Sequence, residues 1–282
     1  MPALRTFGLS LAYDGHTVVD DLDLEVQRGA VTAIVGPNGC GKSTVLRGLS
    51  RLLKPVSGEV LLSAAVSESS GGSGKPVPLR DVWSMRAKEF ARRVALLPQT
   101  PPVPEGITVV DLVGRGRHPH HSLVRRWSEA DDEAIAVAMR VTDTLELAER
   151  HVEELSGGQR QRVWIALTLA QDTDVILLDE PTTYLDVAHQ IDVLDLLVEL
   201  NRRRGTTIVM VLHDLNLAAR YADQVVALRG GRLVAQGRPA DVVDEAFVRS
   251  VFGLESRVIT DPVAGTPLVI PASRDQLIGP TS

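Results

Sequence analysis

The sequence is poor in the features that stabilise secreted proteins or anchor membrane proteins. It contains a single cysteine, Cys40, among 282 residues, so no internal disulfide can form and a reducing compartment is expected. No apolar run reaches about 18 residues, the length that a membrane-spanning helix needs, and no signal peptide is recognisable. We therefore expect any role at a membrane to depend on a separate protein.

Basic residues are fewer than acidic residues. The chain has 30 Lys and Arg against 36 Asp and Glu, a net charge of −6 with histidine neutral. An acidic protein is a poor non-specific binder of nucleic acid, so no nucleic-acid partner is expected. With 44% hydrophobic and 23% charged residues, the composition is that of a globular protein that folds without disulfides.

Residue patterns predict an α/β protein with strands at both ends of the chain. Alternating or continuous apolar runs indicate strands at 9–13, 17–19, 22–26, 31–35, 58–62, 175–178, 208–212, 225–228 and 232–235. The Gly230-Gly231 pair predicts a hairpin. A Ser- and Gly-rich stretch at 63–78 is typical of a flexible loop. No internal repeat is visible.

Helical patterns occupy the middle of the chain and alternate with the later strands. Helices are expected at 108–115, 128–144, 191–201, 215–221 and, as one short helix before a Pro-containing tail, after about 240, and 87–97 is expected to form a short helix followed by a strand. Ser128 and Asp131 fit a capping box at the start of one of them. We take about 90–155 as a helical insertion within the α/β domain.

A phosphate-binding loop is the most informative motif. The apolar run 31–35 leads into a stretch that fits G-x-x-x-x-G-K-[ST] and opens a helix. Its glycines let backbone N–H groups point at an anion, and the helix start adds a positive dipole end. Lys42 would reach the β- and γ-phosphates, and the Ser43 hydroxyl would bind Mg²⁺. The loop comprises Gly36, Pro37, Asn38, Gly39, Cys40, Gly41, Lys42, Ser43 and Thr44.

Two carboxylates follow the apolar strand at 175–178. Asp179, at the strand end, can hold Mg²⁺ through water. Glu180, one residue further, could orient or deprotonate an attacking water. Gln99 opens a proline-rich loop, and His213 follows a buried strand as Asp179 does, so strand order could place it near the γ-phosphate.

A second anion-binding helix start is predicted at 155–159, Leu-Ser-Gly-Gly-Gln, followed by a helix with Val163, Leu167 and Ala170 on one face. A chain with a single phosphate loop has no evident intramolecular use for this second terminus. We infer that Ser156 and the glycines after it meet a nucleotide held by another copy or another subunit.

Together these segments resemble the nucleotide-binding subunit of an ABC transporter over about residues 5–255. The matching segments, in order, are Walker A at 36–44, the Q-loop residue Gln99, the signature at 155–159, Walker B at 175–180, the D-loop at 184–186 and the switch histidine His213. The resemblance implies a P-loop NTPase (RecA-like) core with an N-terminal antiparallel β subdomain and an inserted α-helical subdomain. It implies a single domain, 1–282, with core at about 1–89 and 156–255, helices at about 90–155 and a tail at 256–282.

The same resemblance implies how ATP and Mg²⁺ are bound. Tyr13 would stack on the adenine. Each ATP would lie between Lys42 of one protomer and the signature of the other in a head-to-tail homodimer. Catalysis would fall to Lys42, Gln99, Glu180 and His213, with Mg²⁺ at Ser43, Gln99 and Asp179. The trans side would comprise Ser156, Gly157, Gly158, Gln159 and Asp186.

A finer resemblance links 114–120, 181–186 and 258–271 to the ATPases of bacterial ferric-siderophore, haem and cobalamin importers. It implies a motor on the cytoplasmic face of the membrane, bound to permease subunits and acting indirectly with a substrate-binding protein. The cargo is not readable from this chain. Two other readings stay open: a non-transport ABC protein, although heptads and a second cassette are lacking, and a small-molecule P-loop kinase, in which the signature would have no role.

Two details carry further expectations. His118, His120 and His121 cluster without a nearby cysteine or acidic ligand, so a metal site is not expected. The family resemblance implies that they belong to a surface loop near the permease contact. Cys40 lies among phosphate-binding N–H groups and beside Lys42, a setting that is expected to lower the pKa of its thiol. The loop at 63–78 is longer than the family resemblance implies.

Overall fold

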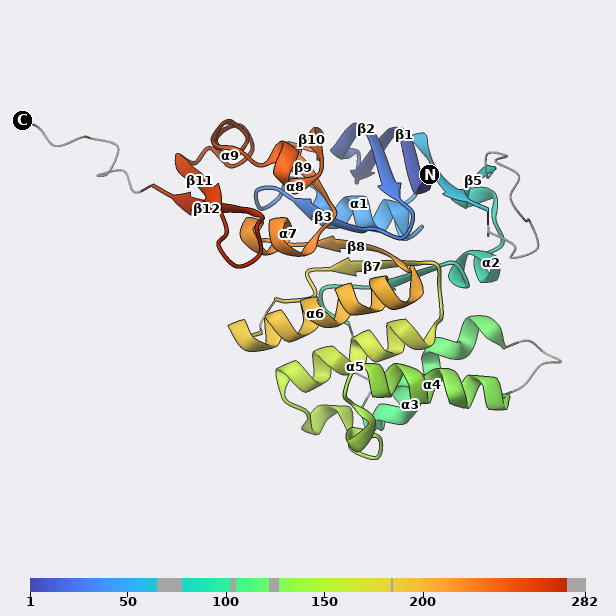
Figure 1. Ribbon diagram of the computed structural model, residues 1–282. Coiled ribbons are helices and arrows are strands. Elements are labelled where there is room, and N and C mark those ends of the chain that lie inside the picture. Colours follow the sequence, from blue (N-terminus) through green and yellow to red (C-terminus); the bar gives the residue numbers. More distant parts are fainter. Residues whose placement is uncertain (65–77, 102–104, 122–126, 184, 273–282) are drawn as a thin grey trace, which may run out of the picture.

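The computed structural model describes residues 1–64, 78–101, 105–121, 127–183 and 185–272. Figure 1 shows an antiparallel sheet above a larger, mostly parallel sheet, with helices beneath. This arrangement confirms the predicted α/β class with an antiparallel β subdomain and a helical subdomain. The loop predicted at 63–78 lies almost entirely outside the described residues.

The upper sheet has the strand order β2-β1-β4-β5 and every pairing in it is antiparallel. The sequence predicts two short strands at 17–19 and 22–26, whereas the structure joins them into one, because Asp21 bulges from the ladder with φ 51° without ending it. The strands are β1 (Pro2–Tyr13), β2 (His16–Gln27), β4 (Ser57–Ser63) and β5 (Leu79–Asp81).

The larger sheet has the order β10-β9-β3-β8-β7-β6, parallel except for the β9–β10 hairpin at Gly230-Gly231. Its central strands are buried along their whole length, as their continuous apolar sequences predict. The strands are β3 (Val31–Val35), β6 (Val94–Leu97), β7 (Val175–Asp179), β8 (Thr207–Val211), β9 (Gln224–Arg229) and β10 (Arg232–Gly237).

Alternate residues of these central strands enter two separate hydrophobic cores. In β7, Val175 and Leu177 face α1 (Lys42–Leu49) and the antiparallel sheet, while Ile176 and Leu178 face the helical side. Helix α1 is therefore enclosed between the two sheets, as Figure 1 shows. Six of the eight residues of α1 are buried, which fixes the direction in which the loop before α1 opens.

The helical segment is built from α3 (Val109–Gly114), α4 (Glu129–Val141) and α5 (Gly157–Ala170), which pack together below the sheet (Figure 1). The expected start of this segment at about residue 90 is too early, because β6 pairs with β7 in the core sheet. Between β5 and β6 lie η1 (Val82–Ser84) and α2 (Ala87–Ala91). Within the helical segment, η2 (Arg115–His120) follows α3, and η3 (Leu145–Leu147) and η4 (Val152–Glu154) lie between α4 and α5.

The later helices are α6 (Val187–Arg204), α7 (Leu215–Tyr221), α8 (Pro239–Val242) and α9 (Glu245–Phe252). The tail was expected to hold one short helix, yet it also forms a hairpin, β11 (Ser256–Thr260) with β12 (Pro267–Pro271). The Asn216 amide on α7 fixes this hairpin, since it donates to the Val269 carbonyl at 3.1 Å and accepts from the Val269 N–H at 2.7 Å.

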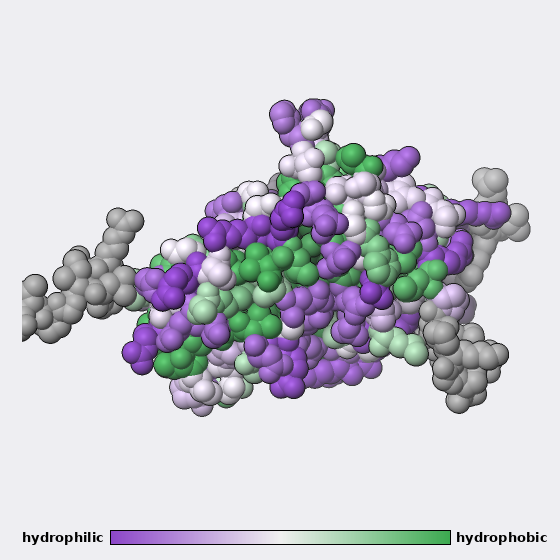
Figure 2. Space-filling model, turned by 90° about the horizontal axis from the view of Figure 1, so that it is seen from above, coloured by the Kyte–Doolittle hydropathy of each residue, from purple (hydrophilic) through white to green (hydrophobic). Residues whose placement is uncertain are grey.

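None of the helices within the described ranges is both long and apolar enough to cross a bilayer. Seen from above, patches of apolar residues alternate with hydrophilic ones over the face drawn in Figure 2.

One buried ion pair holds the helical segment together. The Arg117 guanidinium, on η2, donates to Asp131 Oδ1 at 2.9 Å and to the carbonyl of Ala170 at the end of α5 at 2.8 Å. Burial raises the pKa of the Asp131 carboxyl, but hydrogen bonds from Ser128 and Arg117 outweigh it and bring the pKa to about 2. Three elements therefore depend on one carboxylate.

We predict that Asp131→Asn lowers the free energy of unfolding by about 3 kcal/mol, because it leaves the Arg117 charge buried without its counterion. Urea titration measures this, with Glu133→Gln as the control, since the exposed Glu133–Arg140 pair is worth less than about 1 kcal/mol. The wild-type contribution of Asp131 should be present above the unfolded carboxyl pKa of about 4 and fade as the pH falls towards 2. Equal destabilisation by both substitutions would contradict this role.

Candidate nucleotide-binding site

The phosphate loop lies between β3 and α1, where the backbone is too crowded for side chains. Gly36 has φ 148°, and a Cβ there would lie 2.2 Å from the Leu228 carbonyl oxygen of β9. Only glycine fits such an approach. The close approach of β9 therefore fixes the backbone at Gly36, where the phosphate loop begins.

Lys42 spans this loop from the first turn of α1. Its side chain is buried, with the residue 5% exposed, and Nζ donates to the carbonyls of Gly36 at 2.9 Å and Pro37 at 3.0 Å. These partners are neutral oxygens, so they position the ammonium without cancelling its charge. A buried, positioned cation beside a helix start favours an anion such as a phosphate.

The end of β7 brings two oxygen groups together. Ser43 Oγ donates to Asp179 Oδ1 at 2.8 Å. Burial raises the pKa of the Asp179 carboxyl, the Ser43 hydrogen bond opposes that rise, and the neighbouring Glu180 charge adds to it. A hydroxyl and a carboxylate are the hard oxygen donors that suit Mg²⁺, which keeps its other positions for water and phosphate.

Glu180 is the centre of a hydrogen-bonded cluster. Its Oε2 accepts from Gln99 Nε2 at 2.6 Å and from Thr183 Oγ1 at 3.0 Å, and its Oε1 lies 2.6 Å from His213 Nε2. Its backbone has φ 54°, a left-handed conformation that costs a non-glycine residue roughly 1–3 kcal/mol. The cluster holds the carboxylate in place despite that strain.

Strand order explains why these distant residues meet. β6, β7 and β8 are neighbours in the sheet and run parallel. Gln99 follows β6, Glu180 follows β7 and His213 follows β8 within two residues of each strand end. Carboxyl ends of parallel strands are where α/β folds bind ligands. The expectation that His213 would approach the site from a strand end is confirmed.

A cavity of about 440 Å³ opens at this edge, lined by Val18, Asn38, Gly39, Gly41, Lys42, Ser43, Thr44, Gln99, Glu180 and His213.

Sequence reasoning missed Val18 on β2 and Thr183; the only signal for Thr183 was its place just after the acid pair. Tyr13 is not part of this lining, and its hydroxyl accepts a hydrogen bond from Arg47 at 3.0 Å. Its adenine-stacking role stays a prediction.

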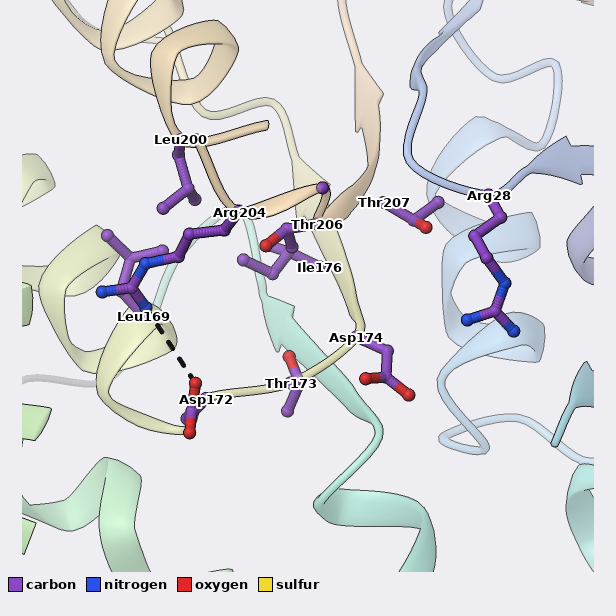
Figure 3. A pocket seen from close by; sticks show the side chains of 11 residues that line it. Arg28, Leu169, Asp172, Thr173, Asp174, Ile176, Leu200, Arg204, Thr206 and Thr207 are labelled. Atoms are coloured by element: carbon purple, nitrogen blue, oxygen red, sulfur yellow. Dashed lines mark ion pairs between the residues drawn. The ribbon is translucent and has the colours of Figure 1, made fainter. Parts of the chain in front are cut away.

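A second cavity of about 500 Å³ lies at the opposite, amino-terminal ends of β7 and β8 (Figure 3). Arg204 and Asp172 approach within 3.9 Å across it, and Asp174 and Arg28 lie on its other side. Its Arg204 is faced by the Asp172 carboxylate, whereas the partners of Lys42 are neutral carbonyls, so this cavity is the weaker candidate for a phosphate ligand.

The expectation that the setting of Cys40 lowers the pKa of its thiol is wrong. The residue is 4% exposed and packs into the core beneath the antiparallel sheet. Burial raises the pKa of the Cys40 thiol above its usual range, and the opposing effects of the Lys42 charge and of backbone hydrogen bonds are smaller. Its backbone N–H donates to the Pro37 carbonyl, so Cys40 shapes the loop from within.

We predict that iodoacetamide alkylates native Cys40 far more slowly than the same thiol in urea. Only the thiolate reacts, and a raised pKa keeps the thiol protonated until the pH is well above neutral. Mass spectrometry of timed samples gives both rates, and the native rate should increase as the pH rises. Equal rates at pH 7 would show that Cys40 is accessible.

The signature segment forms a capped helix start outside this cavity. Ser156 Oγ accepts from the Gln159 N–H at 3.3 Å, and Gln159 Oε1 accepts from the Ser156 N–H at 3.1 Å. Ser156 and Gly157 are exposed, and neither lines the phosphate cavity of the same chain. Asp186 caps α6 and is also exposed. The structure thus brings the Walker, Q-loop and switch residues together, and leaves Ser156, Gly157 and Asp186 at the surface. Tyr184 of the D-loop lies outside the described residues.

The three histidines at 118, 120 and 121 lie on η2 and at its end. No group of at least three His, Cys, Asp or Glu side chains suited to a metal ion occurs in the part of the chain that the structure describes. His120 Nε2 instead lies 2.8 Å from the Gln171 carbonyl, and His121 stacks against Trp127 with ring centroids 5.3 Å apart.

Fold and site together define a P-loop nucleoside triphosphatase. A family model described as ABC transporter matches residues 19–183, and the chain belongs to the ABC transporter family as an ATP-binding, ATP-hydrolysing subunit.

Whole-length relatives support this assignment. The petrobactin import ATP-binding protein FpuD of Bacillus anthracis is 52% identical over 98% of this chain and 96% of its own. The ferric enterobactin transport ATP-binding protein FepC of Escherichia coli is 49% identical over 96% and 94%. Among solved structures, an inward-facing metal-chelate type ABC transporter, described as putative, gives a TM-score of 0.79 at 25% identity over 98% and 99%.

Proposed function

We propose that this protein is the motor subunit of a bacterial ABC importer for ferric siderophores. It would bind at the cytoplasmic face of the membrane to separate permease subunits, which receive cargo from a substrate-binding protein. The observation that supports the motor most directly is the Glu180 carboxylate, held between Gln99 and His213 at the mouth of the Lys42 cavity. Every group needed to polarise a water beside a bound phosphate is then supplied from three adjacent strand ends.

The residues divide the chemistry among themselves. Backbone N–H groups of the loop and the Lys42 ammonium hold the phosphates and offset charge on the γ-phosphate. Glu180 orients the attacking water and accepts its proton, while His213 and Gln99 fix the carboxylate. Ser43, Asp179 and Gln99 would hold Mg²⁺, which when bound neutralises phosphate charge.

The exposed signature supports a head-to-tail homodimer. Ser156, Gly157 and Asp186 lie at the surface, and Val187, beside them at the start of α6, is 76% exposed. A large apolar side chain beside an exposed helix start is a surface that gains from being covered. In a head-to-tail pair it would close over the partner's nucleotide.

The permease contact is proposed for the helical segment. A groove of about 400 Å³ there is lined mainly by apolar side chains of α3 and α4, including Val110, Ile135 and Met139. Trp127 and Leu145 at its edge are 50% and 48% exposed. An apolar groove of this kind suits an amphipathic helix, and its neighbour along the chain is the loop that begins at Gln99.

Siderophore cargo is inferred from the relatives. Those at about 50% identity carry names of petrobactin, achromobactin and enterobactin transport systems. A hemin import protein of Rhodococcus jostii is 42% identical, so haem is the second candidate, and cobalamin or another chelate is the third. Whole-chain similarity to import subunits disfavours the kinase and non-transport readings.

The transport role predicts one outcome for Lys42→Ala. Removing the buried ammonium should slow ATP hydrolysis about 100-fold or more, because an oriented charge on the phosphates is lost. In cells that contain the matching permease, the same change should abolish uptake of radioactive ferric siderophore. Lys88→Ala, an exposed lysine on α2, serves as the control. If the variant loses uptake of haem or cobalamin and keeps uptake of siderophore, the cargo must be reassigned. If the Lys42 variant hydrolyses ATP at the normal rate, the site assignment is refuted.

The dimer model predicts that Glu180→Gln traps a closed pair. Without its base the protein should bind ATP and not turn it over, so the bound state accumulates. Size-exclusion chromatography with light scattering should show a dimer with ATP and a monomer with ADP. A monomer under both conditions would contradict the head-to-tail model.

A further inference from the structure

The signature helix and the start of α6 come close together at Gly158 and His189. A Cβ added to Gly158 would lie 2.7 Å from His189 Cδ2 and 3.2 Å from its Cγ and Nε2. Real Cβ atoms do not approach that closely, so the ring occupies the space that any other residue at 158 would need. The imidazole therefore sets how near α5 and α6 can come.

The His189 ring is itself held in place. Its Nδ1 lies 2.7 Å from Asp186 Oδ1, and the His189 backbone N–H donates to the same oxygen at 2.9 Å. Both hydrogen bonds lower the pKa of the Asp186 carboxyl. The carboxylate thus stays charged and keeps the ring turned towards Gly158.

Two amide side chains brace the same region. Gln161 Nε2, one turn into α5, donates to the Pro181 carbonyl at 2.8 Å, and Gln190 Nε2 donates to the Leu185 carbonyl at 3.0 Å. Pro181 is therefore held to α5 and Leu185 to α6. His189 adds the contact at their exposed tips, where a second protomer would bind.

We propose that His189 is a positioning residue that sets the spacing between the signature helix tip and Asp186, so that both meet the partner protomer's nucleotide together. The inference rests on the proposed head-to-tail dimer. His189 would touch neither nucleotide nor water; it acts through Gly158 and Asp186.

The first test changes the ring alone, in the Glu180→Gln background. His189→Ala should raise the ATP concentration that half-saturates dimer formation about 10-fold, since loss of fixed geometry weakens an assembled site. His189→Asn, whose amide can still donate to Asp186, should recover part of the loss. His151→Ala, an exposed histidine elsewhere, is the control. Unchanged thermal unfolding would separate positioning from folding.

The second test uses the close approach. Gly158→Ala should abolish ATP-dependent dimers, and Gly158→Ala combined with His189→Ala should restore them in part, because the obstructing ring is gone. A double variant no better than Gly158→Ala, or His189→Ala indistinguishable from its parent, would overturn the inference. Failure of the Glu180→Gln parent to dimerise at all would instead refute the proposed function.

Discussion

The meeting of three strand ends at one carboxylate is the constraint on which the site depends. Glu180 holds a strained backbone conformation, and it is kept there by Gln99 and His213, which arrive from the strands on either side. The parallel order of β6, β7 and β8 makes this possible, and that order in turn requires strands buried on both faces. The chemistry is a property of the sheet more than of any single loop.

Local motifs were readable from the sequence because their spacing alone defines them. The loop from Gly36 to Thr44 and the capped start at Ser156 needed only neighbours in the chain, and both have the predicted form. To predict that Gln99 meets Glu180, one must know where β6 lies in the sheet, and no local sequence pattern gives that position. For the same reason the helical segment was expected to begin one strand too early.

Burial by distant elements accounts for the remaining errors. From the sequence, the neighbours expected for Cys40 were only Lys42 and backbone N–H groups. Burial beneath the antiparallel sheet reverses the direction in which the pKa of the Cys40 thiol shifts. The hairpin β11–β12 escaped notice because the Asn216 amide, about two strands and two helices earlier, completes its support. The lining residue Val18 carries no motif at all.

In the proposed dimer, Lys42 of one protomer and Ser156 of the other hold one nucleotide jointly. Mixing a Lys42→Ala chain with a Ser156→Arg chain, both carrying Glu180→Gln, tests it directly, because only a head-to-tail pair of the two retains an intact composite site. Retention of labelled ATP on gel filtration is the measurement. We expect that neither variant alone retains ATP in a dimer, whereas the mixture retains ATP in a dimer. A mixture that behaves as the sum of its two inactive parents would contradict it.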